Sequence, residues 1–234
     1  MEIVIYVYNG ITALDAVGPY EVLSKLPNAN VKFVGETKGI IVSDSHFLKL
    51  VAEYEISEIE KADILLIPGS VIGFVREAKK KNVKDWIKKI HQTTQWTVSV
   101  CTGSIRLAST GILAGLKASS HWAVIHLLKE YGAIPTLERF VREDKIITSQ
   151  GVSAGIDMSL YLASQIVGVE EAKAYQLMIE YFPQPPLNYK LMEETSEETK
   201  LLARKLTEVR VKKDMPMFEM AKNIPSILKL KRGK

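Results

Sequence analysis

The chain has 234 residues, of which 47% are hydrophobic and 25% are charged, a composition typical of one globular domain with or without an appendage. No apolar run is long enough to span a membrane, and no signal peptide precedes the first predicted strand, so we expect a cytoplasmic protein without a membrane partner. The net charge of +4 is uneven, because residues 195–234 hold 11 Lys/Arg against 5 Asp/Glu. The rest of the chain is slightly acidic and does not indicate a nucleic-acid partner.

The cysteine and histidine content argues against two kinds of site. The single cysteine, Cys101, cannot form an internal disulfide, which agrees with a reducing compartment. The four histidines are scattered, and none lies in a Cys/His cluster with the spacing of zinc ligands. We therefore expect no structural metal site.

Short apolar runs alternate with helical patterns along most of the chain. This alternation predicts an α/β sandwich around a mostly parallel sheet. Two further pairs of short strands, within 39–51 and 138–148, predict hairpins. The expected strands are 2–8, 31–36, 63–67, 96–100 and 145–148. The expected helices are 19–26, 83–92, 104–110, 122–131, 154–167 and 169–181.

The character of the chain changes after a cluster of prolines that closes its compact part. A charged segment follows, with Leu202, Leu206 and Val209 on one helical stripe, and a further apolar stretch lies near the C-terminus. We therefore expect two parts, an α/β domain at residues 1–190 and a basic amphipathic helical extension at residues 191–234. The extension is expected to pack on the domain or on a second subunit.

Cys101 lies where a chain would place a nucleophile. It follows a predicted buried strand, precedes a predicted helix, and has small residues, Ser99 and Gly103, two positions to either side. This pattern predicts a nucleophile elbow, which directs the side chain out of the carboxyl edge of the sheet. The N–H groups of the first helical turn favour the thiolate, so we expect a lowered thiol pKa. The alternative is that Cys101 is an inert core residue.

Two other strand ends should meet Cys101 at the same edge of the sheet. Asp15 follows the first strand and could hold a proton beside the thiol. Thr12 and Asp15 also match a capping box, in which the carboxylate merely satisfies backbone donors. Gly69 and Ser70 follow another strand, and their N–H groups could form an oxyanion hole with that of Thr102, although an ordinary turn would look the same.

Two further motifs are less specific. His121 lies 20 residues after Cys101 at a predicted helix start, so it could pair with the thiolate or bind substrate, or it could be a structural cap. Residues 151–157 contain two glycines before a helix but do not form G-x-G-x-x-G, so a nucleotide site is not indicated.

As an ordered set, these motifs resemble the ThiJ/PfpI superfamily, which is related to class I glutamine amidotransferases, and within it the isonitrile hydratase branch. The resemblance covers about residues 2–190 and leaves the C-terminal extension unexplained. The segments that carry it are 14–15, 18–23, 67–69, 100–104, 120–122, 147–158 and 179–186.

The resemblance implies a flavodoxin-like three-layer sandwich and a homodimer. It also implies a small-molecule substrate and a hydro-lyase that adds water to an isonitrile and gives an N-substituted formamide, without a cofactor. In that branch the elbow cysteine, the threonine after it and an aspartate of the first loop matter for activity. These match Cys101, Thr102 and Asp15.

Departures from neighbouring branches leave alternatives open. Thr102 stands where the protease-like branch has histidine, and no His-x-Glu occurs, which disfavours a glutaminase. The glyoxalase branch tends to use glutamate where this chain has Asp15. The extension is too short for two helix-turn-helix motifs, which disfavours a DNA-binding regulator. A non-catalytic small-molecule-binding or redox-sensing protein, and glyoxalase-like activity on α-oxoaldehydes, remain as alternatives.

Overall fold

The computed structural model describes residues 1–71, 73–187 and 194–214. It divides into two units, Met1–Ile179 and Glu180–Lys234. The first unit contains every residue that the sequence places in the candidate site. The apolar stretch predicted near the C-terminus lies outside the described residues.

The main sheet of the first unit has seven strands, which in spatial order are β10 (Phe140–Glu143), β11 (Ile146–Ser149), β7 (Trp96–Val100), β6 (Ile64–Ile67), β1 (Glu2–Tyr6), β2 (Asn30–Gly35) and β5 (Tyr54–Glu55). All neighbouring pairs are parallel except β10 and β11. The central strands β6 and β7 are buried along nearly their whole length because helices cover both of their faces, and every residue of β6 is apolar. The predicted mostly parallel sheet is confirmed.

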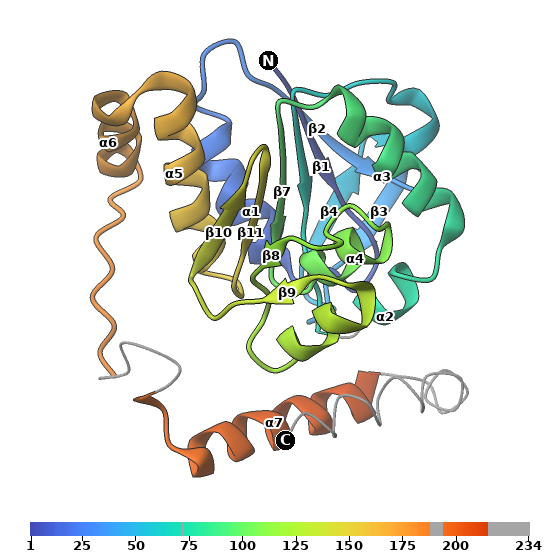
Figure 1. Cartoon of the computed structure of the whole chain (residues 1–234), viewed down its shortest axis with the longest axis vertical. Coiled ribbons are helices and arrows are strands. Elements are labelled where there is room, and N and C mark those ends of the chain that lie inside the picture. The colour runs from blue at the N-terminus through green and yellow to red at the C-terminus, as the bar shows by residue number, and fades with distance from the viewer. Residues whose placement is uncertain (72, 188–193, 215–234) are drawn as a thin grey trace. The chain divides into compact units, whose positions relative to one another are not determined.

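Helices cover both faces of this sheet, as Figure 1 shows. α1 and α5 pack against each other on one face, and α2, α3 and α4 lie on the other. The expected three-layer α/β sandwich is therefore confirmed. The bounds of these helices, and of α6 after them, are α1 (Ala13–Leu23), α2 (Gly73–Glu77), α3 (Lys81–Thr93), α4 (Gly103–Ser109), α5 (Ala154–Val167) and α6 (Val169–Met178).

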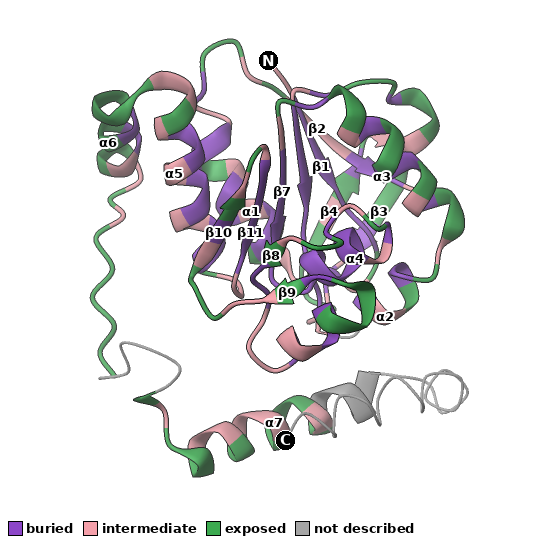
Figure 2. Cartoon of the chain, viewed as in Figure 1, coloured by how far each residue is buried: buried purple, intermediate pink, exposed green. Residues whose placement is uncertain are grey.

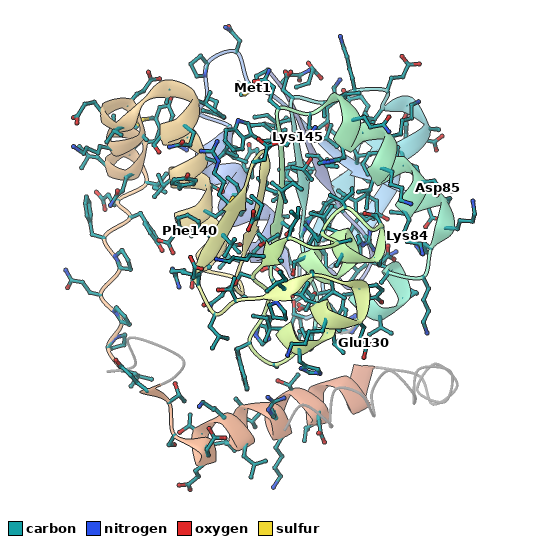
Figure 3. All side chains as sticks on the ribbon, in the orientation of Figure 1. Met1, Lys84, Asp85, Glu130, Phe140 and Lys145 are labelled. Carbon is teal, nitrogen blue, oxygen red and sulfur yellow. The ribbon has the colours of Figure 1, made fainter. Side chains whose placement is uncertain are left out.

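Helix α3 shows how the amphipathic pattern builds the core. Val83, Trp86, Ile87 and Ile90 recur at helical spacing, and all four are buried (Figure 2). Burial of each such side chain contributes about 1.5–3 kcal/mol before entropy is subtracted. Asp85, on the opposite side of the helix, points into solvent (Figure 3).

The short elements differ in part from the prediction. The first hairpin forms as β3 (Gly39–Val42) and β4 (Lys49–Ala52), and β10 with β11 forms the second. The segment expected as a helix at 122–131 is instead a 3₁₀-helix, η2 (Ile125–Tyr131), which Gly132 ends with a left-handed backbone. Two more short elements are η1 (Ile56–Glu58) and the pair β8 (Lys117–Ala118) with β9 (Ile134–Pro135).

Helix α1 begins six positions before the expected start, so Pro19 lies inside it. Proline lacks an N–H, which removes one bond from the helix ladder, and α1 tolerates that loss. The earlier start places Asp15 in the first turn of the helix. The carboxyl group is therefore held by regular structure rather than by a loop.

The second unit contains α7 (Glu197–Asp214), within the segment where a helical extension is expected. The side chains predicted to form its apolar stripe, Leu202, Leu206 and Val209, are 53%, 61% and 59% exposed. That this stripe packs on the domain or on a second subunit stays a prediction.

Candidate active site

Cys101 follows β7 directly and precedes α4, which is the strand, turn and helix order of an elbow. Its φ is +59°, a left-handed backbone that a residue with a side chain rarely adopts. Its N–H donates to the carbonyls of Ser149 and Gln150 at 3.2 and 3.1 Å. Gly103 is required, because a Cβ there would lie 2.0 Å from the carbonyl oxygen of Ile67. The chain thus holds Cys101 in a strained turn against two neighbouring strand ends.

Asp15 is fully buried beside Cys101. Its Oδ2 accepts a hydrogen bond from the N–H of Gly69 at 3.1 Å. Its Oδ1 accepts no hydrogen bond of normal geometry from the described residues. The capping-box alternative is wrong, because the N–H of Thr12 donates to the Gly69 carbonyl and the Thr12 hydroxyl donates to Asp44. Asp15 therefore faces Cys101, and the Cys101 thiol and the N–H of Val152 both act on its carboxyl group.

Burial is the largest influence on the pKa values of both Asp15 and Cys101. It raises the pKa of Asp15 to about 7, although the Cys101 thiol and the Gly69 N–H lower it in part. Burial, and next the Asp15 charge, raise the pKa of the Cys101 thiol well above its usual range. The predicted lowering of this pKa is therefore wrong for the resting site, because desolvation outweighs the helix N–H groups. The thiol is therefore protonated near neutral pH, and the carboxyl group titrates in the same pH range.

Thr102 joins the elbow to the turn after β6. Its Oγ1 accepts from the N–H of Ser70 and donates to the carbonyl of Ser70, both at 2.8 Å. Gly69 allows this contact, since a Cβ there would lie 2.5 Å from the Thr102 nitrogen and 2.8 Å from the Cys101 Cβ. The Thr102 hydroxyl proton is thus already committed to the protein backbone.

These hydrogen bonds change which N–H groups could form an oxyanion hole. The N–H of Gly69 is bound by Asp15 and that of Ser70 by Thr102, so neither points at a substrate without a rearrangement. The N–H groups that act on the Cys101 sulfur, and lower its pKa in part, belong to Thr102 and Val152. The turn after β6 therefore positions the catalytic candidates, and the charge-stabilising donors lie at the sulfur.

Val152 is a site residue that the sequence analysis missed. It follows β11, has a φ of +45°, and its N–H acts on both Cys101 and Asp15. The signal was present, because β11 lies beside β7 in the parallel sheet and its end reaches the same edge. The glycines of residues 151–157 predict the start of a helix, and α5 does begin at Ala154. The same segment therefore both starts this helix and supplies the Val152 N–H to the site.

His121 lies next to this loop. A Cβ on Gly151 would lie 2.7 Å from His121 Cδ2, and His121 Nδ1 accepts from the N–H of Ala123 at 3.3 Å. The rings of His121 and Trp122 are 5.7 Å apart. These contacts agree with the alternative that His121 is a structural residue. A role of His121 toward the thiol or a substrate stays a prediction.

Two searches of the described residues bear on other site types. No group of three or more His, Cys, Asp or Glu side chains there could hold a metal ion. None of the helices in that part of the chain is both long and apolar enough to cross a membrane.

Comparisons with known proteins agree with this fold. The model of the DJ-1/PfpI family matches residues 1–165. Isonitrile hydratase from Pseudomonas putida is 35% identical over 189 residues, which cover 80% of this chain and 82% of that protein. The glutathione-independent glyoxalase DJ-1 of Schizosaccharomyces pombe is 24% identical over 184 residues, 74% of this chain and 95% of that protein. The crystal structure of a ThiJ/PfpI family protein from Pseudomonas syringae has a TM-score of 0.84 at 31% identity and covers 91% of this chain and 88% of that one.

Proposed function

Because the chain belongs to the DJ-1/PfpI family, we propose that it is an enzyme that uses Cys101 and Asp15 to add water to the terminal carbon of an isonitrile. The product would be an N-substituted formamide. The observation that carries this proposal is the buried pair at the elbow, in which the Cys101 thiol lies in hydrogen-bonding reach of the Asp15 carboxyl group. The similarity to isonitrile hydratase, over most of both chains, supports the choice of substrate class.

The first step joins the thiol to the substrate. Ionised Asp15 takes the thiol proton as the Cys101 sulfur attacks the isonitrile carbon, and then gives that proton to the same carbon. The carbon has gained one sulfur and one hydrogen, so the intermediate is a thioimidate with a carbon–nitrogen double bond. The N–H groups of Thr102 and Val152 stabilise the negative charge on sulfur during the attack.

The second step adds water and releases the enzyme. Asp15 takes a proton from water, whose oxygen bonds to the thioimidate carbon, and gives the proton to the nitrogen. The carbon–sulfur bond then breaks, the hydroxyl proton returns to sulfur through Asp15, and the formamide leaves. A carboxyl pKa of about 7 suits a group that must accept and donate protons in turn near neutral pH.

The test uses the full-length chain and cyclohexyl isonitrile. We expect conversion to the formamide, identified by mass spectrometry, with methylglyoxal turned over slowly or not at all. Lactate formation from methylglyoxal at a higher rate would replace the proposal with the glyoxalase alternative, which the similarity to the yeast glyoxalase favours. Failure to turn over either compound, together with reversible oxidation of Cys101, would favour a redox-sensing protein.

Several properties belong to the same proposal. We infer a small-molecule substrate, a homodimer and a cytoplasmic location, without a nucleic-acid or membrane partner. Light scattering of the purified chain tests the homodimer. The division into a domain at 1–190 and a helical extension at 191–234 is tested by limited proteolysis, which should cut first near the boundary.

A further inference from the structure

The loop between β11 and α5, residues 150–153, holds Cys101 from one side. The carbonyl of Gln150 accepts the Cys101 N–H at 3.1 Å. The N–H of Val152 acts on the Cys101 thiol and on the Asp15 carboxyl group. The groups that fix this loop therefore also fix the surroundings of the sulfur.

Val152 takes its place in the loop at the cost of backbone strain. Among the described residues other than glycine that have a positive φ, it is the only one with a β-branched side chain, which makes its φ of +45° unfavourable. A half-turn of the peptide between Gly151 and Val152 would bring this φ to about −135°, in the extended region that valine favours. Gly151 has no Cβ to oppose such a rotation. The flip would point the Val152 N–H away from the sulfur, so the loop must be held against it.

Arg139 contacts the chain on both sides of this peptide. Its carbonyl accepts the N–H of Gln150 at 2.9 Å, just before the peptide. Its guanidinium binds the carboxylate of Asp157 through Nε and Nη2, and Nη2 lies 3.4 Å from the hydroxyl of Ser153, just after the peptide. Ser153 makes no side-chain cap bond to α5, so its hydroxyl is turned to Arg139 instead. One residue thus spans the strained peptide.

Arg139 is itself held at the start of β10. This strand begins at the next residue and pairs with β11, which contacts α5 (Figure 1). The side-chain amide of Gln150 also donates to the carbonyl of Leu137 at 2.6 Å, a second bond between the same two segments. The Arg139 side chain is 51% exposed, and an ion pair so open to water adds little to the stability of a whole domain. We therefore expect the effect of this pair to be local.

We propose that Arg139 is a positioning residue, which ties Gln150 to the first turn of α5 and so keeps the Val152 N–H directed at the Cys101 sulfur. Arg139 acts through the loop and not on the reacting atoms. Its importance for turnover rests on the proposed hydration reaction, in which this N–H stabilises the charge on sulfur. The loop geometry itself does not depend on that reaction.

The first test examines the loop without turnover, in full-length Arg139→Gln. The three-bond coupling between the amide and Hα protons of Val152 reports its φ, and it should increase toward the value of an extended backbone. Labelling of Cys101 by iodoacetamide at pH 8 should slow by about 3- to 10-fold, because the thiol loses an N–H that favours its ionised form. A variant with the wild-type coupling and labelling rate would overturn the proposal.

Arg142→Gln is the matched control. Arg142 is also exposed, and it also links the second hairpin to α5, but it binds Gln165 and Tyr161 toward the far end of that helix. The control loses the same charge and a similar contact without touching residues 150–153. Its Val152 coupling and labelling rate should equal those of the wild type. An equal change in both variants would assign the effect to charge and overturn the proposal.

Two further variants show whether Arg139 acts through Asp157. Arg139→Lys keeps the charge without the planar fork, so its labelling rate should be intermediate, and it carries the test if Arg139→Gln does not fold. Asp157→Asn should slow labelling, and the double variant Arg139→Gln/Asp157→Asn should be no slower than Arg139→Gln alone. Losses that multiply in the double variant would show that the two residues act separately and overturn the pair.

Turnover of cyclohexyl isonitrile separates this proposal from the proposed function. Arg139→Gln should lower kcat by about tenfold with little change in KM, because the lost contact forms at the sulfur during the attack. A raised KM with unchanged kcat would contradict a positioning role. If the wild type does not hydrate isonitriles, the coupling and labelling measurements still decide whether Arg139 holds the loop.

Discussion

The two ends of β7 carry buried polar clusters of opposite character. At the amino end, the hydroxyl of Thr97 lies 2.8 Å from both His91 Nδ1 and Thr94 Oγ1, and the Lys145 ammonium donates to the carbonyls of His91 and Thr94. At the carboxyl end, Cys101 has a strained backbone and Asp15 keeps one oxygen without a regular hydrogen bond. Satisfied buried groups stabilise a fold, whereas unsatisfied and strained ones persist where chemistry needs them. We call the amino end of β7 the structural end, and the carboxyl end, which carries the proposed catalytic pair, the chemical end.

The largest expected effect is a loss of activity on substitution of Cys101, at the chemical end of β7. Cys101→Ala should lower formamide production by at least about 10⁴-fold, because the nucleophile is lost. The melting temperature should change little, since alanine keeps the Cβ and the backbone strain of this position and loses only the buried sulfur. Kinetics with cyclohexyl isonitrile and a thermal melt measure both. A variant that keeps its turnover would return Cys101 to the inert core residue of the alternative interpretation.

Asp15→Asn tests whether the chemical end costs stability. The folded pKa of about 7 lies above the ordinary carboxyl value of 3.8, so the folded chain holds the proton more tightly and wild-type stability falls as pH rises from about 4 to 7. The variant has no such group. Relative to the wild type, it should gain about 2–3 kcal/mol between pH 5 and pH 8 in urea unfolding. A constant difference across this range would show that the Asp15 pKa is not raised.

Thr102→Val removes the hydroxyl that binds both backbone groups of Ser70. We expect kcat to fall by about 10- to 100-fold, because the turn that holds Asp15 loses a buried two-way contact. Thr102→Ser, which keeps the hydroxyl, should recover most of the rate. If the serine variant is as slow as the valine variant, the methyl group rather than the hydroxyl is what matters.

Thr97→Val makes the corresponding change at the structural end. It leaves His91 and Thr94 without a shared partner, so unfolding should become easier by about 1–3 kcal/mol. Turnover by the folded enzyme should be unchanged, which steady-state kinetics below the melting transition would show. A slower enzyme of normal stability would contradict the division of β7 into two ends.

The smallest expected effect concerns the thiol itself. The rate of iodoacetamide labelling should keep rising with pH beyond the free-cysteine value of about 8.5 without levelling off, because the Cys101 pKa is raised. Asp15→Asn removes the negative neighbour and should speed labelling at pH 8 by about 3- to 10-fold. Labelling that is fast and independent of pH near 7 would restore the lowered pKa expected from the sequence.

Regular structure could be predicted where local sequence decides it. The bounds of β7 and α5 match the prediction because a β-branched apolar run defines the first and Gly168 ends the second. Helix α1 started early and η2 became a 3₁₀-helix, since a proline inside a helix and a poorly ordered pattern of apolar residues are ambiguous locally. The DJ-1/PfpI fold followed from the order of motifs along the chain.

The sequence predicts which residues form the candidate site better than it predicts the pKa shifts of those residues. The convergence of Asp15 and Cys101 follows from parallel strand ends meeting at one edge. The sign of the thiol pKa shift does not, because a helix start is visible in a sequence whereas the degree of burial is not. The engaged amides of Gly69 and Ser70, and the contribution of Val152, depend on partners more than 30 residues away.

The spacing of these partners has a consequence for synthesis of the protein. The site brings together Asp15, Gly69, Cys101 and Val152, which occupy well-separated segments of the chain. A growing polypeptide that has reached Cys101 still lacks β11, the neighbour whose carbonyls fix the elbow, and Val152 beyond it. A domain generally folds as one unit, and pairing over such separations is slow. The elbow is therefore completed only after Val152 has been made, and a shorter chain carries Cys101 without the neighbours that set its pKa.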